Sequence, residues 1–266
     1  MKDKKEVRHS RRNFLKKAGT AATVASVGLA AHLKIPGLNA DETGIPRYAM
    51  VVDLRKCYGC RACTVACKSE FEVPLGVFRT VVEQKEKGSF PGVKRFFQPR
   101  LCNHCANPIC VEDCPVDPVK GVYKNNGKTV EYDKKATYQR PDGLVLVDYE
   151  RCVGCLACVD ACPYNARYED PIKLAGGEPD NHTVGKCVAC FHRVDNGIEP
   201  SCVNTCPAEA RIFGDINDPT SKVSKLLKEH KTQVLFPEEK TNPHVFYISF
   251  EKGIYEKGGR WIDEIK

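Results

Sequence analysis

Sixteen cysteines, arranged in four groups of four with none left over, constrain this chain more than any other feature of its sequence. The first and third groups share the spacing C-x2-C-x2-C-x3-C, and the second and fourth groups both begin with C-x2-C and end with C-x3-C-P. This regularity indicates an internal duplication of a unit that carries two metal centres. The groups are Cys57, Cys60, Cys63 and Cys67; Cys102, Cys105, Cys110 and Cys114; Cys152, Cys155, Cys158 and Cys162; and Cys187, Cys190, Cys202 and Cys206.

The spacing within a group points to iron–sulfur chemistry. Cys57, Cys60 and Cys63 place three thiols on one short loop that can wrap three corners of an iron–sulfur cube. Cys67 follows one helical turn later and points away from that loop, and in two-cluster ferredoxins the corresponding cysteine ligates the other cluster. The sequence therefore predicts four [4Fe–4S] clusters. Zinc is the alternative, because the fourth group alone has a spacing that a zinc site could use, but zinc sites usually pair two distant C-x2-C knuckles.

Residues between the cysteines suit the same chemistry. Gly59 and Gly154 stand where the backbone must bend tightly and aim its N–H groups at sulfur. Prolines follow the last cysteine of three groups, whereas Lys68 follows Cys67, so the turn at that point is expected to differ.

Some residues near the cysteines have two interpretations. His104 and His192 could each replace a thiolate, but sixteen cysteines already satisfy four cubes, so a hydrogen-bonding or surface role is favoured. One basic residue precedes the first cysteine of three groups, where it either raises the reduction potential of a cluster or is an ordinary solvated charge. These residues are Lys56, Arg151 and Lys186.

Local patterns predict a mixture of strands and short helices. The apolar segments 47–53 and 144–149 predict strands that lead into cluster loops, and segment 245–250 predicts another strand. Residues 120–140 are polar, with a turn signal at Asn125-Asn126-Gly127 that predicts a hairpin. Segment 219–230 predicts a helix capped by Asp218.

The net charge of +7 is confined to the N-terminus. Residues 1–40 contain nine Lys or Arg and two Asp or Glu, and the other 226 residues contain 32 of each sign. A basic nucleic-acid-binding surface is therefore not predicted. Four clusters of net charge 2− each would make the loaded body about 8−.

Residues 1–40 have the layout of an export signal: a charged stretch, an apolar stretch over about 18–33, and small residues up to Ala40. Within it, residues 10–16 read SRRNFLK and match the twin-arginine signal. A basic amphipathic helix is the alternative, and both cleavage after Ala40 and retention as an anchor remain open. Such export carries folded, loaded proteins, so the cysteines are expected to hold clusters and not disulfides. The absence of another long apolar run predicts a soluble body.

With these motifs in place, the chain resembles the four-cluster electron-transfer subunits of molybdopterin oxidoreductases of the dimethyl sulfoxide reductase family. Short segments are most similar to the tetrathionate reductase branch, namely 47–50, 99–105, 151–155, 210–215 and 243–247. Residues 90–94 and the export signal are also similar to the four-cluster protein of formate-dependent nitrite reduction, which has no molybdenum partner. The resemblance implies electron transfer in the periplasm between a quinol-oxidising membrane subunit and a molybdopterin catalytic subunit. The catalytic subunit would reduce tetrathionate or another sulfur oxyanion. Polysulfide, thiosulfate, arsenate and selenate enzymes remain further candidates.

The resemblance also implies a fold and a wiring of the clusters. The fold is α+β, with duplicated bacterial two-cluster ferredoxin-like units and loop and hairpin insertions. One unit is formed by residues 41–100 plus 180–266 and the other by 101–179, after the signal peptide 1–40. The implied ligand sets are set 1, Cys57, Cys60, Cys63 and Cys206; set 2, Cys187, Cys190, Cys202 and Cys67; set 3, Cys102, Cys105, Cys110 and Cys162; and set 4, Cys152, Cys155, Cys158 and Cys114. Set 1 would lie nearest the molybdenum subunit and set 4 nearest the membrane subunit.

An enzymatic role is the main rival. The C-x3-C-x2-C triad of radical enzymes that use S-adenosylmethionine is absent, and full cysteine ligation would leave no open iron for a substrate. The sequence therefore predicts a non-catalytic electron-transfer subunit. A structural zinc protein is the second rival, and it would be colourless where an iron–sulfur protein is brown.

The export signal gives a first testable prediction. Because the exporter reads the paired arginines, Arg11→Lys combined with Arg12→Lys should leave the protein in the cytoplasm yet still brown. Cell fractionation with an immunoblot and a visible spectrum measures both properties. Undiminished periplasmic protein would show that an exported partner carries this chain.

Overall fold

The computed structural model describes residues 44–125, 127–171 and 184–250, all within one unit that spans Asn39–Lys266. The predicted signal peptide, 1–40, lies outside the described residues. Over the described ranges, no helix combines the length and the apolar character required to cross a bilayer.

A four-stranded sheet is the largest regular element. Its order is β10 (Arg211–Asp215), β1 (Tyr48–Asp53), β12 (Val245–Ile248) and β11 (Thr232–Gln233). Strand β1 runs antiparallel to β10 and parallel to β12, and five of its six residues are buried. The strands predicted before the first cysteine group and near the C-terminus are confirmed.

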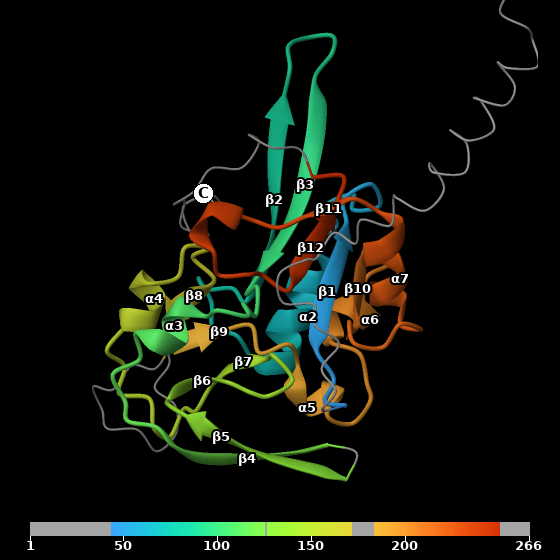
Figure 1. Cartoon of the computed structure of the whole chain (residues 1–266). Coiled ribbons are helices and arrows are strands. Elements are labelled where there is room, and N and C mark those ends of the chain that lie inside the picture. Colours follow the sequence, from blue (N-terminus) through green and yellow to red (C-terminus); the bar gives the residue numbers. More distant parts are fainter. Residues whose placement is uncertain (1–43, 126, 172–183, 251–266) are drawn as a thin grey trace, which may run out of the picture. The chain divides into compact units, whose positions relative to one another are not determined.

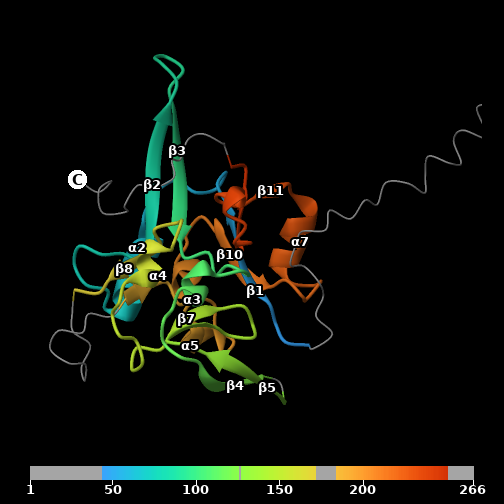
Figure 2. The same cartoon turned by 60° about the vertical axis from the view of Figure 1, so that its left-hand side comes forward.

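The other strands form two-stranded antiparallel pairs. These pairs are β2 (Thr80–Lys87) with β3 (Lys94–Leu101), β4 (Val119–Asn125) with β5 (Lys128–Lys134), β6 (Thr137–Gln139) with β7 (Val145–Val147), and β8 (Arg167–Glu169) with β9 (Val184–Lys186). The hairpin predicted at Asn125-Asn126-Gly127 is therefore confirmed as β4–β5, and β7 confirms the strand predicted before the third cysteine group. Figures 1 and 2 both show the β2–β3 pair extending away from the remaining elements.

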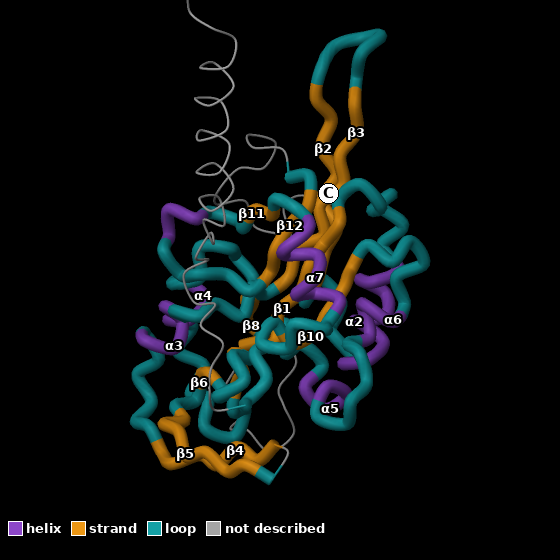
Figure 3. The backbone as a smooth tube through the Cα atoms, turned by 45° about the vertical axis from the view of Figure 1, so that its right-hand side comes forward, coloured by secondary structure: helices purple, strands orange, loops and turns teal. Residues whose placement is uncertain are grey.

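The helices are short and are joined by long loops (Figure 3). They are α2 (Ala62–Phe71), α3 (Ile109–Glu112), α4 (Ala157–Asp160), α5 (Phe191–Val194), α6 (Ser201–Asn204), α7 (Lys222–Glu229) and the single 3-10 turn η1 (Pro237–Glu239). Four of them carry cysteines, namely α2, α3, α4 and α6. The fold is thus mixed α and β, as expected.

Helix α7 starts later than predicted. Its cap is Ser221, whose hydroxyl accepts a hydrogen bond from the Ser224 N–H at 3.0 Å. Asp218 does not cap the helix; its carboxylate accepts from the Thr220 N–H at 2.8 Å and closes the preceding turn. Ser and Asp are both good caps, and the turn at Asp218 places Ser221 at the helix start.

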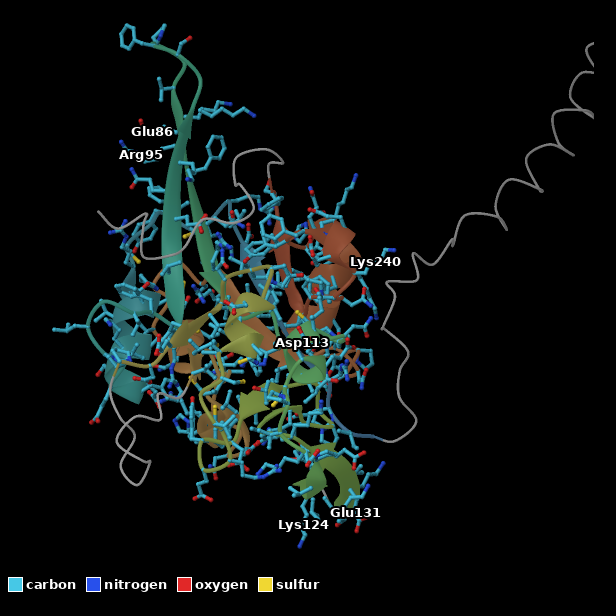
Figure 4. The ribbon with its side chains drawn as sticks, turned by 90° about the vertical axis from the view of Figure 1, so that its left-hand side faces the viewer. Glu86, Arg95, Asp113, Lys124, Glu131 and Lys240 are labelled. Carbon is cyan, nitrogen blue, oxygen red and sulfur yellow. The ribbon has the colours of Figure 1, made fainter. Side chains whose placement is uncertain are left out.

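The hydrophobic core is built around the cysteines. Its largest cluster combines apolar side chains such as Val52, Leu101 and Tyr247 with four buried cysteines. Those cysteines are Cys63, Cys102, Cys187 and Cys202. Away from this core, the outer half of the β2–β3 arm is exposed and carries the surface ion pair of Glu86 and Arg95 at 2.8 Å, which lie side by side in Figure 4.

A buried ion network joins two distant parts of the chain. Arg140, between β6 and β7, donates to both oxygens of Asp142 and also to Asp195, which follows α5. Asp142 is fully buried, so its charge depends on Arg140. Removal of one partner of a buried pair leaves the other charge uncompensated.

This network generates a stability prediction. Arg140→Met should lower the free energy of unfolding by about 3–5 kcal/mol, because Asp142 would stay buried without a counter-charge. The matched control is Lys120→Met, which breaks the exposed pair of Lys120 and Asp133 and should change the stability far less, because water screens that pair. Anaerobic urea titration of the loaded protein, followed by circular dichroism, compares the two. Equal losses of unfolding free energy in the two variants would contradict a stabilising role of the buried network.

Candidate iron–sulfur sites

The loops of the first and third cysteine groups have the same backbone course. Gly59 and Gly154 have φ values of +80° and +66°, and the residues two positions later, Arg61 and Leu156, also have positive φ, at +59° and +62°. Helices α2 and α4 begin directly after these left-handed residues. The tight bends expected at the two glycines are therefore confirmed.

The loops aim backbone N–H groups at sulfur atoms. Hydrogen bonds of this kind stabilise negative charge on sulfur and tune the potential of a cluster. Such contacts run from Ala189 to Cys187 Sγ at 3.4 Å, Ser201 to Cys190 Sγ at 3.4 Å, Ala210 to Cys206 Sγ at 3.3 Å, and Thr137 to Cys114 Sγ at 3.5 Å.

Three cavities in the described part of the protein are lined by cysteines from different groups, four cysteines in two of them and five in the third. One is lined by Cys102, Cys105, Cys110 and Cys162. A second is lined by Cys114, Cys152, Cys155 and Cys158. A third is lined by Cys67, Cys187, Cys190 and Cys202, and Cys102 also reaches it.

The remaining four cysteines lie around Cys57 and Tyr58. Burial raises the pKa of Cys57, and the neighbouring charges of Cys63 and Cys206 raise it further. The Tyr58 hydroxyl interacts with Cys60, and its pKa is raised by slight burial and then by that thiol and by Cys206. In all four places, the last cysteine of one group therefore lies beside the first three of another.

These sites fit [4Fe–4S] clusters in their donor chemistry. Burial raises the pKa of Cys162 and of Cys187 to about 11 and that of Cys190 to about 12, and neighbouring thiols add to the rise. Thiolates crowded in this way require a strongly positive partner, which iron supplies when it displaces the protons. Four sulfurs around one cavity match the four corners of a cube.

Both histidines have protein partners, and His104 also lines the cavity of Cys67, Cys187, Cys190 and Cys202. His104 Nδ1 accepts the Val145 N–H at 3.0 Å, and complete burial lowers the pKa of His104 well below its usual value. His192 is about half exposed, and its Nε2 lies 2.8 Å from Glu70. The hydrogen-bonding or surface role favoured from the sequence is thus what the structure shows for both.

Lys68 explains the turn that lacks a proline. Helix α2 continues past Cys67 to Phe71, and the Lys68 ammonium donates to the carbonyl oxygens of Val73, Pro74 and Val77 at 2.8–3.2 Å. This side chain organises the loop after α2. Cys67 nevertheless stays buried on its cavity.

The three basic residues that precede cysteine groups differ in burial. Lys56 is exposed, and Arg151 is partly exposed and donates to the carbonyl oxygens of Lys134 and Asp117. Lys186 is fully buried and donates to the carbonyl oxygens of Val145 and Cys187.

Two buried arginines escaped the sequence analysis. Arg167 and Arg211 each lie five residues after the last cysteine of a group, in the repeated pattern C-P-x-x-A-R. Both are nearly inaccessible to solvent and contact thiol sulfur. That repeat was the available signal, because it places a cation at equivalent points of the two halves.

Comparison with known proteins assigns the class. Residues 93–216 match the family described as the 4Fe-4S dicluster domain. The sequence is 42% identical over 249 residues to the B subunit of tetrathionate reductase from Salmonella typhimurium, an alignment covering 91% of this chain and 89% of that protein. It is 38% identical to the B polypeptide of polysulfide reductase from Wolinella succinogenes (78% and 96% covered) and 35% identical to the NrfC homolog of Haemophilus influenzae (92% and 96% covered).

The protein therefore belongs to the iron–sulfur subunits of molybdopterin oxidoreductases, and its cofactors are [4Fe–4S] clusters. The sequence resemblance to this family is confirmed, including the similarity to the tetrathionate reductase branch.

The first cluster loop generates a prediction about Gly59. A Cβ at this position would lie 2.3 Å from the Phe97 ring on β3, and the φ of +80° already disfavours a side chain. Gly59→Ala should therefore cost the protein the cluster of this loop, or about four of its iron atoms. Gly76→Ala is the matched control, because Gly76 has a φ of +83° with no atom near the added Cβ.

Anaerobic iron and sulfide analysis of the two variants separates a steric effect from a general backbone effect. Full iron content in Gly59→Ala would mean that Phe97 moves aside freely. Equal iron loss in both variants would mean that backbone strain alone is responsible.

Proposed function

We propose that this protein conducts electrons through four [4Fe–4S] clusters between partner subunits and performs no substrate chemistry itself. The observation that carries the proposal is the gathering of sixteen cysteines in four places, four at each. Every iron of every cube then has a cysteine ligand, so none is left open for a substrate. Such clusters can only accept and release electrons.

The proposed ligands are sets 1 to 4 as defined from the sequence. The three cavities support sets 2, 3 and 4, and the neighbourhood of Tyr58 supports set 1. Sets 1 and 2 belong to the proposed unit 41–100 plus 180–266, and sets 3 and 4 to the unit 101–179. Electrons pass along the row from set 1 to set 4 or in reverse.

The proposed partners are a molybdopterin catalytic subunit, next to set 1, and a quinol-oxidising membrane subunit, next to set 4. The relatives named as reductase subunits support this arrangement, and tetrathionate or another sulfur oxyanion is the proposed terminal substrate. The twin-arginine signal supports a location in the periplasm, with attachment to the membrane through the partner.

A second candidate is electron donation for formate-dependent nitrite reduction without a molybdenum partner. The similarity to the NrfC homolog over 92% of the chain favours it. Molybdenum analysis of the affinity-purified native complex distinguishes the two: stoichiometric molybdenum supports the reductase, and its absence supports the second candidate.

The exchanged ligation can be tested at Cys67. Fully loaded protein should contain about 16 iron and 16 sulfide per chain, four of each per cube. Cys67→Ser should alter the paramagnetic resonance signal that Cys187→Ser also alters, because both remove ligands of set 2. Quinol-driven turnover of the assembled complex should fall, although the substrate site is untouched.

Cys57→Ser is the control, since it removes a ligand of set 1 from the loop that carries Cys67. If Cys67→Ser altered the Cys57→Ser signal and spared the Cys187→Ser signal, each group would bind its own cluster and the exchanged wiring would be wrong.

A further inference from the structure

In the described part of the chain, three cations that are at most 5% exposed lie beside the cysteines without a carboxylate. Arg167, Lys186 and Arg211 are 5%, 0% and 3% exposed. Within the described ranges, none of them forms an ion pair with Asp or Glu. Two other buried arginines do: Arg100 pairs with Glu83, and Arg140 pairs with Asp142 and Asp195. The three therefore need another source of negative charge.

Arg167 lies between sets 3 and 4. Its Nη2 donates to the Sγ of Cys110, a member of set 3, at 3.1 Å, and its side chain lines the cavity of that set. Its Nη1 lies 3.4 Å from the Thr137 hydroxyl, and the Thr137 N–H donates to the Sγ of Cys114 in set 4.

Arg211 occupies the equivalent place between sets 1 and 2. Its Nη2 donates to the Thr80 hydroxyl at 2.8 Å, and the side chain hydrogen-bonds to Cys202 of set 2. The N–H of the preceding residue, Ala210, donates to the Sγ of Cys206 in set 1 at 3.3 Å. Among the described residues, the buried Nη1 of Arg211 finds no hydrogen-bond acceptor.

Lys186 lies between sets 2 and 3. Its ammonium donates to the carbonyl oxygen of Cys187, a ligand of set 2, and to that of Val145. Val145 lines the cavity of set 3. Cys187 and Cys102, one from each set, both line the cavity of set 2, so the two clusters approach each other here.

The β8–β9 register brings two of these charges together. Arg167 and Lys186 are direct partners across the antiparallel pair, and both are buried. Directly opposed residues lie on one face of such a pair, where like charges repel. Burial of an unpaired cation is also costly. Anionic clusters on both sides offset these costs, because each oxidised cube with its four thiolates carries 2−.

We propose that Arg211, Lys186 and Arg167 are the counter-ions of the cluster row, one at each of its three junctions, and that they raise the reduction potentials of the clusters on either side. This inference rests on the proposed ligand sets. In each transfer, a reduced [4Fe–4S]1+ cluster loses one electron to a neighbouring [4Fe–4S]2+ cluster, and the two exchange charge states without proton transfer. A cation between them stabilises the electron on either cluster.

The test compares neutral variants of the loaded protein by redox titration with paramagnetic resonance detection. Loss of a nearby positive charge disfavours the added electron and lowers the potential. Arg167→Gln should lower the potentials of sets 3 and 4 and spare set 1, and Arg211→Gln should lower those of sets 1 and 2 and spare set 4. Lys186→Met should lower those of sets 2 and 3. Lys56→Met is the matched control, because Lys56 also precedes a cysteine but is exposed and screened by water.

Unchanged potentials in loaded Gln and Met variants, or equal shifts in Lys56→Met, overturn the inference. If Arg167→Gln or Arg211→Gln loses iron, the charge-retaining Arg→Lys variant decides. If the Lys variant retains its iron and has wild-type potentials, the counter-ion role is supported. If it loses as much iron as the Gln variant, the shape of the arginine matters and its charge does not, which refutes the counter-ion role. A wild-type protein with fewer than four clusters refutes the proposed function instead, and that count is independent of the shifts.

Discussion

The bond between thiolate sulfur and iron is the interaction on which the rest of this fold depends. Four of the helices are only four residues long, and four sheets have only two strands. Helices and hairpins of this size are not stable alone in water. Four cysteines belong to the largest apolar cluster, so the packing of the surrounding loops depends on what the cysteines bind. The sheet around β1 leads into the first cysteine group, and the Arg140 network joins the β6–β7 turn to the end of α5.

The features that sequence analysis predicted are those with a local signal. The bends at Gly59 and Gly154, the β4–β5 turn and the strands before the first and third cysteine groups each follow from a few adjacent residues. The prediction of a helix cap at Asp218 was wrong because two capping residues stand three positions apart, and only the turn geometry chooses Ser221. Lys68 shows the same limit, since its three carbonyl partners come from a loop whose path the sequence does not specify.

The sequence did not reveal which of the basic residues near the cysteines are buried. Lys56 and Lys186 have the same relation to a following cysteine, yet one is exposed and the other has no solvent contact. The difference arises because β9, which ends at Lys186, pairs with β8 inside the protein, while Lys56 lies on a turn after β1. Arg167 and Arg211 were missed for the same reason, because an arginine in a short strand is ordinarily a surface residue.

The β8–β9 register has a consequence for how the chain acquires its structure. Before cofactor insertion, the arrangement that sets Arg167 against Lys186 would enclose two repelling charges with no anion nearby. The folded arrangement is therefore less favourable in free energy for the polypeptide without clusters than for the polypeptide with them. Cluster binding is thus coupled to the folding equilibrium. The burial of Arg167 against Lys186 therefore favours closure of the β8–β9 pair in the polypeptide that holds its clusters.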